Sequence, residues 1–144
     1  MLETIENNKE TLAYILRRTF DRPGIHFFTP GDYSQQLGFM KHPAGKRISP
    51  HQHNICERSI TMTQEVLFIR KGRVRVDFYD KQCAYLESRV LEAGDVILLA
   101  SGGHGFEALE ELEMVEVKQG PYMGEQDKTR FEAPTPEKLN WGEQ

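Results

Sequence analysis

The chain has 144 residues, a net charge of −4 and 28% charged residues of both signs. This length suits one domain with a core of its own, and no basic stripe of the kind that binds nucleic acid stands out. The longest purely apolar run, 96–100, is far too short to cross a bilayer. We therefore expect one soluble domain over 1–144, with neither nucleic acid nor a membrane as its partner.

Cysteine content and the N-terminal residues bear on the compartment. Cys56 and Cys83 are too few for a disulfide framework and indicate a reducing environment. The first residues are acidic and polar, and they lack the pattern of a signal peptide. These features predict a cytoplasmic protein.

The first third of the chain carries weak strand signals. Residues 1–10 read as a polar lead-in, and the apolar run 11–18 is ambiguous between helix and strand, with the β-rich remainder favouring a strand. A strand at this place often pairs with the sheet edge of a neighbouring subunit, which predicts a homodimer. Turns rich in Pro and Gly bound two further short strands, 25–28 and 35–41.

From residue 65 onward the strand signals become regular. Residues 66–69 and 74–78 flank a turn with Gly72, the pattern of a hairpin in which glycine takes a positive φ. Apolar residues alternate with Arg73 and Arg75, so we expect one buried and one solvated face. Many short strands separated by turns are typical of an all-β sandwich or barrel. The remaining predicted strands are 85–91, 96–100, 105–109 and 112–118, followed by a polar tail, 123–144, that hugs the surface or is loose.

Two histidines suggest a metal site. His51 and His53 are two residues apart, so on an extended segment both imidazoles project from the same face. A carboxylate from Glu65 and a third imidazole from His104 would complete the ligand set. Glu57 competes for the carboxylate position because it lies nearer to His53, but Glu65 opens a strand, and strands hold ligands better than loops do. Such a set suits Zn, Fe(II), Mn, Ni or Cu without selecting one.

In these residues the chain resembles the cupin superfamily. The first cupin motif runs glycine, five residues, His-x-His, a gap, glutamate, six residues, glycine. The second runs from a glycine through a proline to a glycine and a histidine. Eleven residues separate His53 from Glu65 where the family has three or four, and Ala100 stands at the proline. The matching residues are Gly45, His51, His53, Glu65 and Gly72 for the first motif, and Gly94, Gly102 and His104 for the second.

The resemblance implies the fold and the partners. It predicts a cupin-type double-stranded β-helix, a jelly-roll barrel with its core at about 25–122, that binds a divalent transition metal through His51, His53, Glu65 and His104 and forms a dimer. Segments such as 65–69, 76–80, 101–107 and 117–122 look like small single-domain bacterial cupins, whose genes often lie among polysaccharide-biosynthesis genes. The long gap 54–64 is expected to pass over the barrel mouth.

Two functions follow from this pattern. The first is a metal-dependent enzyme acting on a small polar metabolite such as a sugar or sugar nucleotide, by isomerisation, epimerisation or oxygen-dependent cleavage. Glu116 or Lys118 would transfer a proton, although solvent exposure explains these two residues equally well. The alternative is a cupin without metal that binds a carbohydrate or effector and does not convert it.

Overall fold

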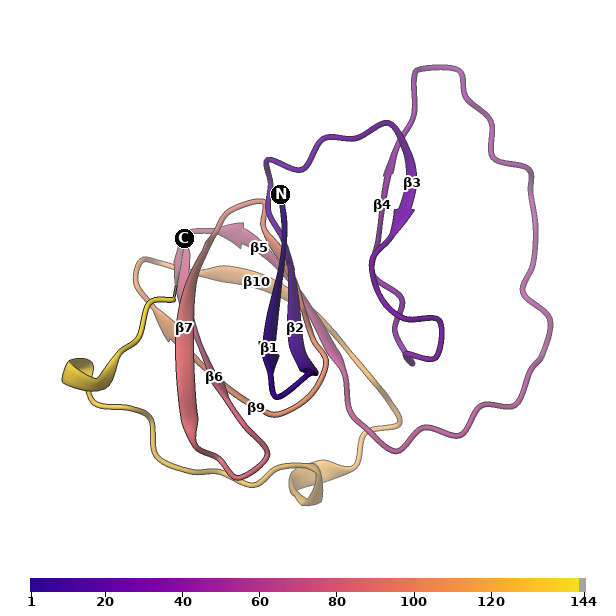
Figure 1. The fold of residues 1–144 in the computed structure, drawn as a ribbon. Coiled ribbons are helices and arrows are strands. Elements are labelled where there is room, and N and C mark those ends of the chain that lie inside the picture. Colours follow the sequence, from indigo (N-terminus) through magenta and orange to yellow (C-terminus); the bar gives the residue numbers. More distant parts are fainter. Residues whose placement is uncertain (143–144) are drawn as a thin grey trace.

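A computed structural model describes residues 1–142 of the chain. It is all-β, which confirms the predicted fold class, and Figure 1 shows the strands together with two short 3-10 turns near the C-terminus. In the part of the chain that the structure describes, no helix has the length and apolar character needed to cross a membrane. The strands are β1 (Leu2–Asn7), β2 (Glu10–Leu16), β3 (Gly24–Phe27), β4 (Gly38–Lys41), β5 (Glu65–Lys71), β6 (Arg73–Tyr79), β7 (Tyr85–Glu92), β8 (Val96–Leu99), β9 (Gly103–Ala108) and β10 (Glu113–Lys118), and the turns are η1 (Gly124–Asp127) and η2 (Pro136–Lys138).

The strands form three antiparallel sheets. The largest has the order β1-β2-β8-β5-β10, the second β7-β6-β9, and β3 and β4 form a separate hairpin. Over residues 1–142 these sheets are not closed into a barrel. The all-β class is therefore established, while the cupin jelly roll stays a prediction.

The five-stranded and three-stranded sheets enclose one apolar core. Strand β6 shows how the sequence builds it: Val74, Val76 and Phe78 alternate along the strand, so all three side chains enter the space between the sheets. Leu67 and Ile69 of β5 meet them from the opposite sheet. All five residues are at most 3% exposed, and burying side chains of this size stabilises the fold by about 1.5–3 kcal/mol each.

The other face of β6 is also buried, which makes the predicted solvated face wrong for Arg75. Arg75 is 8% exposed and its Nε donates to Asp77 Oδ1 at 2.7 Å, while Ser88 Oγ donates to the same oxygen at 2.5 Å. Glu107 of the neighbouring strand β9 lies opposite Arg75, and its Oε2 is 2.6 Å from Arg75 Nη1. A charged side chain on this face is therefore paired with one carboxylate on its own strand and another on a strand that comes much later in the chain.

The N-terminus corrects a second expectation. Residues 1–10 are not a lead-in, because β1 pairs with β2 along its whole length and Ile5 is 1% exposed. β2 in turn pairs with β8 of the same chain, which confirms the strand predicted within 11–18. A homodimer stays a prediction. The last two residues of the predicted tail, 143 and 144, lie outside the described residues.

Candidate functional site

A carboxylate and an imidazole meet where the two sheets open between β10 and β9. Glu65 is the first residue of β5, and the core residues Leu67 and Ile69 follow it on the same face of the strand. His104 of β9 lies opposite the buried Phe78 in the ladder, so its side chain also points between the sheets. His104 Nε2 is 3.1 Å from Glu65 Oε2.

This contact defines the electrostatics of the pair. The hydrogen bond from His104 lowers the pKa of Glu65; burial opposes that shift, and the positive charges of His104, Lys128 and Lys118 add to it. The Glu65 side chain is only 9% exposed, whereas that of His104 is 30% exposed. An ionised carboxylate only accepts hydrogen bonds, so His104 donates to it through Nε2–H, and in the neutral imidazole Nδ1 is then the acceptor.

The pair lines a cavity of about 710 Å³. Its walls include the aromatic rings of Tyr79, Phe106 and Phe131 and the cationic side chain of Lys128. Phe131 comes from the C-terminal segment, and its ring centroid lies 4.8 Å from that of Tyr79. A glycine beside His104 permits this packing, because a Cβ at Gly103 would lie 2.8 Å from the Phe131 ring.

Strand β10 supplies the two residues predicted to transfer protons. Lys118 lies opposite Glu65 in the antiparallel ladder and Glu116 lies opposite Leu67, so both share the face that carries Glu65. Lys118 Nζ is 4.0 Å from Glu116 Oε1, and their side chains are 25% and 46% exposed. The catalytic role of both residues stays a prediction; Lys118 is near enough to Glu65 for its positive charge to lower the pKa of that carboxyl.

The predicted histidine pair lies elsewhere. Residues 42–64 contain no strand, and Figure 1 shows them as a wide arc outside β3 and β4. His51 and His53 are both exposed on this arc, with ring centroids 5.6 Å apart, and Glu57 is exposed there as well. The expected extended strand for the histidines is therefore wrong. Of the two carboxylates considered, Glu65 is the one that contacts His104.

The positions of the four predicted ligands determine whether they could bind one metal ion. Within residues 1–142, no three His, Cys, Asp or Glu side chains gather in a way that could hold a metal ion. His51, His53, Glu65 and His104 do not fit one ion as they lie here, because the first two are on the outer arc. Ligation of a metal by all four residues stays a prediction.

Several residues of this site carried no clear sequence signal. Lys128 and Phe131 belong to the tail, which was read only as polar surface. The one local hint was an aromatic residue, Phe131, within a charged stretch. Comparisons with protein-family models, curated proteins and solved structures found no match for this chain. The function must therefore be argued from the site alone.

Proposed function

We propose that this chain is a cupin-type enzyme that isomerises or epimerises a small polar metabolite, such as a sugar or sugar nucleotide, with Glu65 and His104 as its proton-transfer pair. The observation that carries the proposal is the 3.1 Å contact between the buried carboxylate and the partly exposed imidazole at a cavity wall. Buried acid–base pairs that line a cavity are the usual groups of catalytic sites. The cupin assignment rests on the motif residues, including Glu65 and His104.

The chemistry follows from the tautomer of His104. Glu65 holds the proton on Nε2, so Nδ1 accepts a proton from a C–H next to a substrate carbonyl. Returning that proton to the neighbouring carbon gives an isomer, whereas an epimer forms when water delivers a proton to the same carbon from the other face and His104 later releases the first proton to solvent. Neither outcome needs an oxidant. Lys118, which faces Glu65 in the ladder, is assigned to donate to the carbonyl oxygen as negative charge develops there.

The test is exchange of substrate hydrogen. Purified protein is incubated in D₂O with a panel of aldoses, ketoses and sugar nucleotides, and loss of C–H signals next to carbonyl groups is followed by proton NMR. His104→Gln should slow the exchange by at least about 100-fold, which is the usual contribution of a positioned general base. His26→Gln is the matched control, because His26 is half-buried like His104 but its hydrogen bond goes to the Pro23 carbonyl and not to a carboxylate.

The outcomes separate the two functions. Exchange that requires His104 supports the enzyme. Exchange that His104→Gln leaves unchanged excludes this pair as the catalyst. Binding of a panel compound without exchange supports the non-catalytic binding module instead. The four-residue metal set is tested separately, by elemental analysis of the wild type and of His51→Ala; it is abandoned if neither protein takes up a stoichiometric transition metal.

A further inference from the structure

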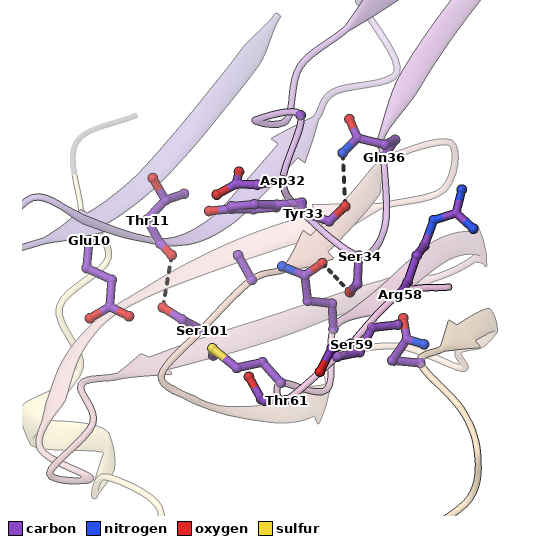
Figure 2. Close-up of a pocket in the computed structure, with 16 residues that line it drawn as sticks. Glu10, Thr11, Asp32, Tyr33, Ser34, Gln36, Arg58, Ser59, Thr61 and Ser101 are labelled. Atoms are coloured by element: carbon purple, nitrogen blue, oxygen red, sulfur yellow. Dashed lines mark hydrogen bonds between the residues drawn. The ribbon is translucent and has the colours of Figure 1, made fainter. Parts of the chain in front are cut away.

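A second cavity lies on the outer side of the five-stranded sheet. It measures about 1060 Å³, slightly above the roughly 300–1,000 Å³ usual for small-molecule pockets. Figure 2 shows its lining, which comes from the start of β2, the loop 31–36, the segment 58–64 and the residues that follow β8 and β10. These parts are distant in sequence, so the cavity is a product of the fold.

This cavity is separate from the one that holds Glu65 and His104. Successive residues of a strand project to opposite faces, and Gln64 and Glu65 follow one another where β5 begins. Glu65 turns inward to His104, while Gln64 turns outward and lines the second cavity. Met62 lines both cavities. Among the described residues the two linings share no other, so a ligand in one cavity is distinguishable from a ligand in the other by the residues it perturbs.

Gln64 is a buried polar residue in the lining of this cavity. It is only 6% exposed, and its Oε1 accepts from Ser34 Oγ at 2.9 Å and from the backbone N–H of Gln35 at 3.1 Å. Because a backbone N–H can only donate, these bonds fix Oε1 as the acceptor and leave Nε2 as the donor. Within residues 1–142, Nε2 has no hydrogen-bond acceptor. A donor that lines a cavity and has no protein partner is available to an oxygen atom of a ligand.

The charges of the lining select a neutral ligand. Figure 2 shows Glu10 at one end and Arg58 at the other, with hydroxyl side chains between them. Glu10 is neutralised by Lys81 at 2.8 Å. Asp32 and Arg58 are of opposite sign, and neither makes an ion pair within the described residues. A lining close to charge balance gives an anion no net attraction.

We propose that this outer cavity binds a neutral, polyhydroxylated compound of the carbohydrate class. Hydroxyl groups both donate and accept, as the mixture of amide and hydroxyl groups around the cavity requires. Tyr33 offers an aromatic surface for the C–H face of a sugar ring, and the free Nε2 of Gln64 donates to one hydroxyl oxygen. A site built from such groups discriminates strongly against compounds that lack the hydroxyl groups.

The test is NMR mapping on ¹⁵N-labelled full-length protein, with glucose, N-acetylglucosamine, maltose and inorganic phosphate as separate probes. A neutral sugar should shift the amide signals of Ser34, Gln64 and Ser101, and phosphate should not. Gln64→Glu keeps the acceptor oxygen and removes the donor, so the sugar should bind about fivefold more weakly, as expected for one hydrogen bond. Gln82→Glu, the same change at an exposed turn, should leave binding unchanged.

A second variant protects the test against misfolding of Gln64→Glu. Arg58→Gln changes an exposed residue and should weaken sugar binding by a similar factor, whereas Arg130→Gln, which alters the Glu65–His104 cavity, should have no effect. The proposal is overturned if no sugar shifts these signals, if phosphate binds equally well, or if the shifts gather at His104 and Phe106. Shifts at His104 and Phe106 would still be compatible with the proposed enzyme. Sugar binding at Gln64 without hydrogen exchange at His104 would support this inference and count against the enzyme.

Discussion

The Glu65–His104 contact makes a prediction about stability that needs no knowledge of the substrate. Glu65 is 9% exposed on its side chain, so little water can replace the imidazole at a distance of 3.1 Å from its oxygen. A hydrogen bond to a charged group contributes about 1.5–3 kcal/mol, and we expect about 2 kcal/mol here because His104 is partly solvated. For a urea m-value of about 2 kcal/mol/M, this corresponds to a fall of about 1 M in the unfolding midpoint for His104→Gln.

The same contact predicts a pH dependence with a definite sign. The pKa of Glu65 is lowered on folding below the ordinary value of 4.5. The contribution of the contact is therefore fully present above pH 4.5 and is lost as the pH falls through the lower pKa of the folded state. A double-mutant cycle with Glu65→Gln and His104→Gln, measured by urea unfolding at pH 7 and again in acid, isolates the coupling energy between the two side chains. A coupling energy below about 0.5 kcal/mol at pH 7, or one that persists unchanged in acid, would refute the reasoning.

Three further variants test how the fold supports the site. Asp77→Ala should destabilise the protein by about 3 kcal/mol in urea unfolding, because it removes two hydrogen bonds from the buried Arg75 and one from Ser88, and leaves Arg75 with Glu107 alone in the described chain; a loss below about 1 kcal/mol would show that the pair is solvated. Phe131→Ala should speed proteolysis of the C-terminal segment, since that ring packs on Tyr79; cleavage at the wild-type rate would contradict this packing. Asp95→Ala should cost about 3 kcal/mol, because Asp95 accepts three hydrogen bonds at 1% exposure, and thermal melts at equal protein concentration check it against the wild type.

The strands were predictable where local pattern and tertiary environment agree. Strands β5 and β6 show this, because the alternating apolar residues of both face one core and Gly72 takes the expected positive φ of 79°. The hairpin predicted between them is wrong, because β5 pairs with β8 and β10 while β6 pairs with β7 and β9 of the other sheet. β1 was missed because most of its residues are polar, and its pairing with β2 is what makes it a strand. Arg75 was assigned to solvent because one of the carboxylates that pair with it, Glu107 of β9, lies about thirty residues later in the chain. No window of sequence around β6 contains that information.

The candidate site was likewise predictable from the sequence only for those residues that lie on strands. Glu65 was preferred to Glu57 because it opens a strand, and the structure pairs it with His104, which is also carried by a strand. The spacing of His51 and His53 predicts a common face only if a neighbouring strand holds that segment extended. In the described chain, residues 42–64 have no strand partner, so the spacing alone did not decide where the two imidazoles lie. A motif gives the residue types, but the hydrogen-bonded partners give the positions.

Residues 64 and 65 connect the two proposals physically. The carbonyl oxygen of Gln64 accepts the backbone N–H of Gln119 at 2.9 Å, which fixes the end of β10 where Lys118 faces Glu65. The side chain of Gln64 meanwhile holds the loop that borders the outer cavity. Gln64 therefore belongs both to the lining of the outer cavity and to the backbone that positions Lys118 opposite Glu65. Since a conformational effect requires a ligand to bind two arrangements with different affinity, occupancy of the outer cavity would change proton transfer only where it shifts this shared start of β5.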